Sequence, residues 1–235
     1  MKLIAERIRG TAGGKILDVA TEAGDFLEEI TNAVSCFDRA VGVDIDNEEL
    51  AKARETYADK PFKFTNMDAG HLSFDDGEFD MVAINAGLHH LADIGGALRE
   101  VVRVLRPGGR FVLREMFCDN QTEKQQASIA AHHWWAKADR LRGRPHFPTL
   151  KKQEIIDFVA ALGLSSYEMA EELCGCDWAA EGKIEKEIEE IRERLTRLAD
   201  HPDYESLKEE AENVIQRLNK TGATCATFLE VIGFK

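Results

Sequence analysis

The stretch KILDVATEAGDF, residues 15–26, decides the fold of this chain. Residues 16–19 are mostly apolar and predict a buried strand, and residues from 25 onward predict the start of a helix. The turn between them is built from small residues and is entered through the acidic residue Asp18. A strand–turn–helix unit of this kind brings backbone N–H groups to the carboxyl edge of a sheet, where ligands bind in α/β proteins. We therefore expect a ligand site at this turn.

Two common phosphate-binding patterns are missing from the chain. Neither G-x-G-x-x-G nor G-x-x-x-x-G-K-[ST] occurs at the turn, so the main sequence support for hydride transfer from a dinucleotide is lost. A second predicted strand, residues 40–44, ends in Asp44, which follows Ala20 by 24 positions. An acidic residue at about this spacing accepts hydrogen bonds from ribose hydroxyls in α/β sheets. The spacing therefore favours a nucleoside ligand.

Strand and helix patterns alternate along most of the chain, which predicts an α/β fold with a doubly wound, mostly parallel sheet of seven strands. The expected strands are residues 16–19, 40–44, 61–65, 79–85, 110–116, 165–173 and 225–232. The expected helices are residues 3–9, 25–34, 47–57, 93–105, 122–141 and 151–162. We expect all of them to form a single domain over residues 1–235.

An insertion between the sixth and seventh strands, residues 180–220, has the spacing of two paired helices. Its apolar residues recur at intervals of four and three: Ile184, Ile188, Ile191, Leu195 and Leu198, then Leu207, Ala211, Val214 and Leu218. His201 and Pro202 separate the two runs, so a helical hairpin is predicted. The hairpin could be a solvated decoration, a homodimer interface or a lid, and the sequence leaves these alternatives open.

The amino-acid composition indicates which binding partners and which cellular compartment to expect. The formal net charge is −13 over 235 residues, which disfavours binding to nucleic acid or to an anionic membrane surface. The five cysteines are scattered and odd in number, and no signal peptide or long apolar run is visible. We therefore expect a reduced cytoplasmic location, no membrane contact and a small-molecule partner.

Five motifs in a fixed order resemble a known family. They are LDVATEAGDF (17–26), VGVDIDNEEL (41–50), TNMDAGHLSFDDGEFDMV (65–82), INAGLHHL (84–91) and LRPGGRFVLRE (105–115). Together they are similar to the class I S-adenosylmethionine-dependent methyltransferases of type 11, which have a Rossmann-like sheet and include the ubiquinone and menaquinone biosynthesis enzymes. The resemblance implies S-adenosylmethionine as cofactor. It also implies methyl transfer to a small organic acceptor by in-line displacement, which depends mainly on positioning.

The resemblance also implies roles for residues at the cofactor. Asp18 matches the acid that orients the methionine amino group, while Ala20 and Gly24 match turn positions whose backbone faces the methionine portion. Asp44 matches the acid that binds both ribose hydroxyls, and Ile45 is placed to pack on the adenine. Three further positions complete the implied set: Asp68 near the adenine amino group, Ala69 through its backbone N–H, and Asn85 at the methionine end. For each acid, a turn or helix cap is the alternative role.

The turn departs from the family pattern, which commonly carries three glycines. Only Gly24 remains here. Alanine at position 20 is tolerated easily if its φ is negative. Glu22 could repel the carboxyl group of the cofactor, but we expect it to pair with the positively charged ammonium.

Acceptor residues should follow the fourth and fifth strands. The candidate catalytic residues are His89, His133 and His146. Residues 118–150 are predicted to form a helical cover over the substrate. A cluster of basic residues there leads to the hypothesis of an anionic acceptor, with a solvated basic stretch as the alternative. It comprises Lys137, Arg140, Arg142, Arg144, His146, Lys151 and Lys152.

No metal site is expected, because Cys174-Gly175-Cys176 lacks the usual C-x₂-C spacing of zinc sites and no second matched pair exists. The alternative function is a non-catalytic S-adenosylmethionine-binding or scaffold protein that uses its helical hairpin for partner contact.

Overall fold

The computed structural model describes residues 3–173 and 175–235. Its contacts divide the chain into two compact units. The sheet unit comprises Met1–Glu115, Gln153–Glu172 and Leu229–Lys235, and the helical unit comprises Met116–Lys152 and Leu173–Phe228. Both the expected cover segment and the expected hairpin fall in the helical unit. The expectation of a single domain stays a prediction.

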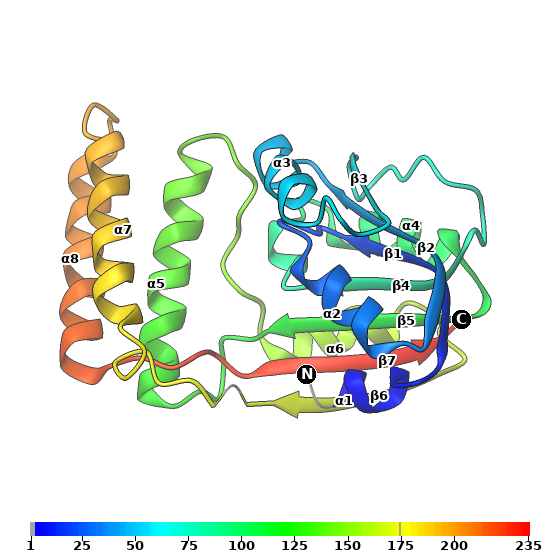
Figure 1. Cartoon of the computed structure of the whole chain (residues 1–235). Helices are drawn as coiled ribbons and strands as arrows, with labels where there is room; N and C mark the ends of the chain where they lie inside the picture. The colour runs from blue at the N-terminus through cyan, green and yellow to red at the C-terminus, as the bar shows by residue number, and fades with distance from the viewer. Residues whose placement is uncertain (1–2, 174) are drawn as a thin grey trace. The chain divides into compact units, whose positions relative to one another are not determined.

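The sheet unit contains the seven predicted strands in the order β3-β2-β1-β4-β5-β7-β6. Their bounds are β1 Ala12–Val19, β2 Cys36–Asp44, β3 Phe62–Asn66, β4 Phe79–Asn85, β5 Leu105–Met116, β6 Ser166–Glu172 and β7 Phe228–Phe234. The strands from β3 to β5 pair in parallel, and β7 runs opposite to its neighbours β5 and β6 (Figure 1). Because strand order reverses between β1 and β4, their carboxyl ends flank the switch point where α/β sheets bind ligands.

Helices cover both faces of this sheet (Figure 1). On one face lie α1 Leu3–Ile8, α2 Asp25–Ala33 and α3 Asn47–Thr56, and on the other lie α4 Ile94–Val104 and α6 Lys152–Ala160. The core of the first face contains Ile8, Leu27 and Leu50, packed against strand residues such as Ile16 and Met81. Alternate strand residues point to opposite faces, so both sides of β1 are apolar and buried. The doubly wound α/β prediction is confirmed.

Three strands begin earlier than the sequence suggests, at Ala12 (β1), Cys36 (β2) and Leu105 (β5), and for β5 the structure shows the reason. Residues 107–109, Pro-Gly-Gly, were expected to separate a helix from a strand that starts at residue 110, but β5 already starts at Leu105. Backbone pairing with the end of the chain explains the difference. Gly108 N–H donates to the Lys235 carbonyl (2.8 Å), and Lys235 N–H donates to the Gly109 carbonyl (3.1 Å).

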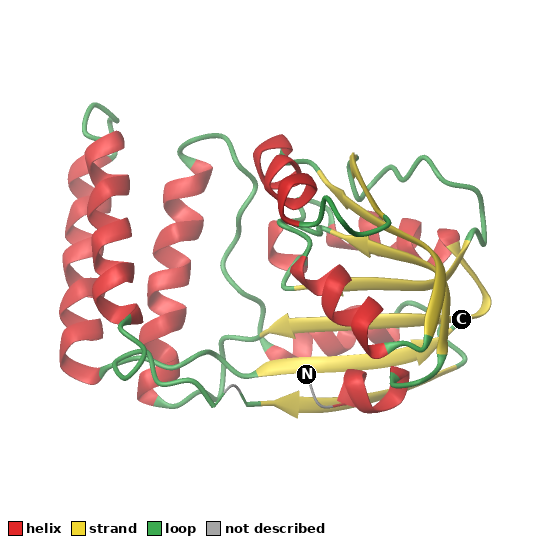
Figure 2. Cartoon of the chain, viewed as in Figure 1, coloured by secondary structure: helices red, strands yellow, loops and turns green. Residues whose placement is uncertain are grey.

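The helical unit is built from α5 Glu123–Arg140, α7 Lys183–Arg197 and α8 Tyr204–Thr221, joined by loops (Figure 2). The capping box of Thr122 and Gln125 begins α5. The heptad residues of the predicted hairpin are buried together with Trp134, whose indole N–H donates to the Leu207 carbonyl (3.0 Å). The hairpin is therefore confirmed. Its apolar seam is covered within the chain, and a homodimer through residues 180–220 stays a prediction.

Among the described residues, we find no helix that combines the length and the hydropathy needed to span a bilayer.

Candidate active site

Asp18 lies at the end of β1 and is fully buried. The Thr21 hydroxyl donates to its Oδ2 (2.6 Å), whereas its Oδ1 has no hydrogen-bond partner among the described residues. A buried carboxylate oxygen without a donor is costly unless something binds it. Asp18 is therefore placed to accept a hydrogen bond from a ligand.

The turn after β1 is strained. Ala20 has φ 56° and Glu22 has φ 47°, both in the left-handed region, so the negative φ under which alanine would be tolerated easily at position 20 is not adopted. Ala86, just after β4, has φ 47°. The two strained turns approach each other closely, because a Cβ added to Gly87 would lie only 2.9 Å from Ala20 Cβ. A larger side chain at position 87 would therefore require the backbone of one turn to shift. Strain of this kind clusters at functional sites.

Gly24 ends the turn at φ 89°, and a Cβ there would meet the ring of Phe64 at 2.8 Å. Glycine is therefore required at this position for both conformation and space. The backbone of the turn leads directly into α2.

Asp44 lies at the end of β2 beside this turn. Its Oδ2 accepts from Glu22 N–H (3.0 Å) and its Oδ1 from Asp46 N–H (2.8 Å). A carboxylate offers about four acceptor sites, so two remain for ligand hydroxyls. The next residue, Ile45, is 50% exposed, and an apolar side chain in this position is available to a flat ring.

Asp18, Glu22 and Asp44, which we call the acidic cluster, all have raised pKa values, chiefly because they are buried. Burial first, and then the charges of Asp44 and Glu22, raise the pKa of Asp18 to about 7, against the lowering effects of Thr21 and Arg114. Burial and the charge of Asp44 likewise raise the pKa of Glu22 to about 7. Burial also raises the pKa of Asp44. A ligand that brings positive charge and hydroxyl donors suits this cluster.

The remaining expected cofactor residues have other contacts in the structure. Asp68 is exposed and its Oδ1 accepts from Gly70 N–H (2.8 Å), as in a turn, while Ala69 is buried. Asn85 Oδ1 accepts from Arg114 Nε (2.7 Å) at the end of β4. Their roles at a cofactor stay predictions.

His89 is the one candidate catalytic histidine in the sheet unit. It is 2% exposed, and its Nδ1 lies 2.7 Å from Oε1 of Glu115, which is fully buried. Leu88 N–H donates to the other oxygen of Glu115 (2.8 Å). The carboxylate therefore favours the Nδ1–H tautomer, and Nε2 is the basic nitrogen. The charge of His89 also lowers the pKa of Glu22, so it belongs to the same edge of the sheet.

No role was predicted for Glu115, although the sequence contained a signal for it. The ends of β4 and β5 pair in register, Asn85 with Arg114, which places Glu115 next to the residues that follow β4. The positions of the two strands alone would have indicated this.

The other two candidate histidines lie in the helical unit. His133 Nε2 is held by Thr149, through its hydroxyl (2.9 Å) and its backbone N–H (3.2 Å). His146 Nδ1 lies 2.9 Å from Asp139 Oδ2, and Asp139 also accepts from Arg194 (2.6 Å). Burial raises the pKa of Asp139, but these two hydrogen bonds outweigh it, so the net shift is downward. Catalytic roles for both histidines stay predictions.

Besides His146, the predicted basic residues Lys137 and Arg140 have partners within the helical unit. Lys137 pairs with Glu210, and Arg140 donates to the His146 carbonyl and lies over the Phe147 ring, 5.8 Å from its centroid. Of the C-x-C pair, Cys174 lies outside the described residues, and Cys176 Sγ accepts from Cys225 N–H (3.4 Å).

Comparisons with known proteins place part of this sequence among methyltransferases. A family model described as a methyltransferase domain matches residues 17–113. The ubiquinone/menaquinone biosynthesis C-methyltransferase of Idiomarina loihiensis is 35% identical over 107 residues, which cover 44% of this chain and 43% of that protein. The chain thus matches less than half the length of this curated relative.

Solved structures extend the likeness to nearly the whole chain at the level of fold. The YcgJ protein of Bacillus subtilis has a TM-score of 0.65 and 22% identity, covering 99% of this chain and 96% of its own. A phosphoethanolamine N-methyltransferase of Haemonchus contortus, solved with phosphomonomethylethanolamine and S-adenosylhomocysteine, has a TM-score of 0.57 and 17% identity, covering 99% of this chain and 51% of its own. Residues 17–113 thus match a methyltransferase domain, the kind of domain that the five sequence motifs also resemble, and the fold of nearly the whole chain is similar to that of these solved structures.

Proposed function

We propose that this chain transfers a methyl group from S-adenosylmethionine to a small organic acceptor. The observation that carries the proposal is the acidic cluster at the switch point of the sheet, where Asp18 Oδ1 is buried without a hydrogen-bond partner among the described residues. S-adenosylmethionine brings a sulfonium and an ammonium group to be matched by carboxylates. It also brings the ribose hydroxyls that Asp44 is placed to bind.

The residues divide the cofactor between them in this proposal. Asp44 binds the ribose and Ile45 packs on the adenine, with Asp68 and Ala69 at the far edge of that ring. Asp18 and Glu22 face the ammonium group, the backbone around Ala20 and Gly24 follows the methionine portion, and Asn85 lies at its end. When bound, the cofactor supplies an electrophilic methyl group on sulfur.

We propose that His89 acts as the general base of the reaction. Its Nδ1–H is held by Glu115 (2.7 Å), so Nε2 is the nitrogen that accepts a proton from the acceptor when methylation requires its loss. The proton then resides on His89, and the buried Glu115 carboxylate stabilises the resulting imidazolium. An acceptor that is already nucleophilic would not need this step.

The acceptor class follows from two considerations. The curated relative named above is a C-methyltransferase of ubiquinone and menaquinone biosynthesis, which favours a ring carbon as the acceptor. The basic residues of the segment 118–150 favour an acceptor with negative charge. Arg144, a basic residue of this segment, is a position on which to test the anionic acceptor. An unchanged KM in the Arg144→Ala variant would remove this part of the proposal.

A product assay tests the function. The purified chain is incubated with S-adenosylmethionine and panels of quinols, phenols, phosphorylated amines and carboxylic acids, and S-adenosylhomocysteine is measured. We expect acceptor-dependent product that is lost in the Asp44→Asn variant. Binding of S-adenosylmethionine without turnover on any panel would favour the alternative, a non-catalytic binding or scaffold protein. The homodimer, the absence of nucleic-acid binding and the cytoplasmic location stay predictions beside it.

A further inference from the structure

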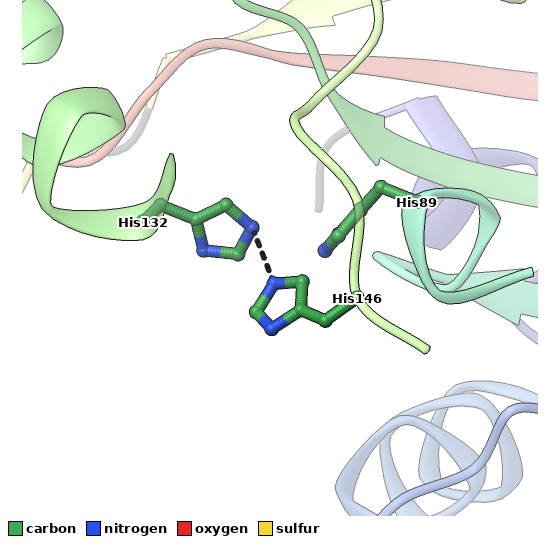
Figure 3. Close-up of side chains that lie close together, drawn as sticks. All are labelled: His89, His132 and His146. Carbon is green, nitrogen blue, oxygen red and sulfur yellow. Dashed lines mark hydrogen bonds between the residues drawn. The ribbon is translucent and has the colours of Figure 1, made fainter. Parts of the chain in front are cut away.

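Two histidine rings of the helical unit lie in contact through their ring nitrogens. His132 lies on α5, His146 lies on the loop that follows it, and their Nε2 atoms are 3.2 Å apart (Figure 3). The ring centroids are 4.8 Å apart and the planes are inclined by 68°. The rings thus meet at an angle, with one nitrogen of each at the contact.

This separation is that of two ligands on one metal ion. Zinc lies about 2.0–2.1 Å from histidine nitrogen in tetrahedral sites, which places two ligand nitrogens about 3.3 Å apart. The observed Nε2–Nε2 distance of 3.2 Å is close to this value. A shared proton is the competing explanation for the same contact.

The surroundings of His146 fix its orientation in the way that metal sites require. Its Nδ1 faces Asp139 Oδ2 at 2.9 Å, so the carboxylate holds the Nδ1–H tautomer and Nε2 presents its lone pair toward His132. Asp139 is itself held by Arg194 of α7 (2.6 Å), whose guanidinium lies 4.9 Å from the centroid of the Trp135 ring. Arg140 also donates to the His146 carbonyl, which anchors the loop. His146 is 6% exposed, so the ring cannot turn away freely.

We propose that His132 and His146 bind one divalent transition-metal ion of the zinc class through their Nε2 atoms, with Asp139 as the positioning residue behind His146. Imidazole nitrogens suit zinc, copper, nickel and cobalt, and the oxygen-preferring magnesium and calcium are excluded by the same donor set. Two protein ligands leave two tetrahedral positions for water or for an exogenous donor. The site is independent of the proposed methyl transfer, and it departs from the expectation of no metal drawn from cysteine spacing.

Metal titration of the full chain tests the proposal. After treatment with a chelator and reduction of the cysteines, Zn²⁺ is titrated by calorimetry and Co²⁺ by its visible absorption. We expect one ion per chain with a tetrahedral Co²⁺ spectrum, and loss of both signals in His132→Asn and in His146→Asn. Asp139→Asn should weaken binding about 10–100-fold, as outer-shell substitutions do.

His133 supplies the matched control, because it neighbours His132 on α5 but its Nε2 is held by Thr149. His133→Asn should keep the ion and the spectrum. Ring ¹⁵N shifts in the wild-type chain give a readout that needs no variant: Zn²⁺ should move the Nε2 signals of His132 and His146 and leave those of His133 in place. Equal binding by wild type and His132→Asn, or unmoved signals of His132 and His146, would overturn the proposal in favour of a shared proton.

Discussion

The acidic cluster of Asp18, Glu22 and Asp44 combines acidic residues visible in the sequence, a strained backbone and raised pKa values. Three carboxyl groups are gathered at the carboxyl ends of two neighbouring strands, two of them with pKa values raised to about 7. The chain holds Glu22 there at a strained φ of 47°. A cluster that costs free energy in the unliganded chain is explained if a cation binds it, which is the argument for S-adenosylmethionine.

The raised pKa values predict how ligand affinity depends on pH. Because their pKa values are about 7, Asp18 and Glu22 are mostly protonated at about pH 6 and mostly ionised at about pH 8 in the folded chain. In the unfolded chain the reference pKa values are near 4. The affinity for S-adenosylmethionine should therefore rise with pH across this window, by up to about tenfold per pH unit, with release of protons. Calorimetry in buffers of different ionisation enthalpy measures both effects.

The same shifts predict the stability of the unliganded chain. Between about pH 4 and pH 7 the folded chain keeps protons that the unfolded chain releases, so its free energy of unfolding should fall as pH rises through that range. The groups that face Glu22 are Asp44, Glu49, Asp25 and His89. Glu22→Gln should flatten both pH profiles, and neutral methylthioadenosine should bind with little pH dependence. A pH-independent affinity for S-adenosylmethionine would contradict this account.

Ala20 predicts a stabilising substitution. The left-handed conformation at φ 56° destabilises an L-residue by about 1–2 kcal/mol, and glycine avoids this strain. Glycine in turn destabilises the folded chain by about 0.5–1 kcal/mol, because it has more conformational entropy to lose on folding. Ala20→Gly should therefore raise the free energy of unfolding by about 0.5–1 kcal/mol in urea titrations. Ala23→Gly, at a neighbouring position outside the left-handed region, is the control and should lower it. Destabilisation by Ala20→Gly would mean that contacts of the alanine methyl group outweigh the strain.

His89 and Glu115 predict a rate effect once an acceptor is identified. His89→Gln should lower kcat by about 10²–10⁴-fold, while the affinity for S-adenosylmethionine changes little. Glu115→Gln should lower kcat as well, because the carboxylate no longer stabilises the protonated ring. Unchanged kcat in both variants would mean that the acceptor needs no base.

At the scale of the element, the hairpin α7–α8 shows most clearly that the spacing of apolar residues in the sequence predicts which side chains pack together. Ile191 is fully buried among the heptad residues, so Ile191→Ala should cost about 2–5 kcal/mol in the helical unit. The three tryptophans, Trp134, Trp135 and Trp178, all lie in that unit, so their fluorescence reports its unfolding. Exposed Glu193→Ala should change stability by less than about 0.5 kcal/mol. Equal effects of the two variants would contradict the observed packing.

Most elements could be predicted because apolar periodicity and turn residues determine them. β4 was expected at residues 79–85 and lies at Phe79–Asn85, and Thr122 opens α5 as its pattern indicates. The start of β5 was missed because its pairing with Lys235 is remote in sequence. In the site, Asp18 and Asp44 followed from strand ends. The left-handed Ala20 and the contact of Asp139 with His146 depend on tertiary structure that no local pattern encodes.

At the scale of the whole molecule, the sheet unit and the helical unit carry different proposed sites. The family match covers residues 17–113, which lie wholly in the sheet unit, and every residue that we propose for the cofactor lies there. The helical unit carries the proposed metal site and the proposed substrate cover. A fold of this class hosts many chemistries, so the function must be decided at the acidic cluster rather than by architecture.

Calorimetric titration of S-adenosylmethionine into the wild-type chain and into Asp44→Asn tests the central claim most directly. Our account predicts one site per chain in the wild type and a loss of affinity of about 10-fold or more in the variant, since hydrogen bonds to a charged group contribute about 1.5–3 kcal/mol. Thermal unfolding of the unliganded variant confirms that it is folded. No binding by the wild type, or equal binding by both chains, would contradict the account.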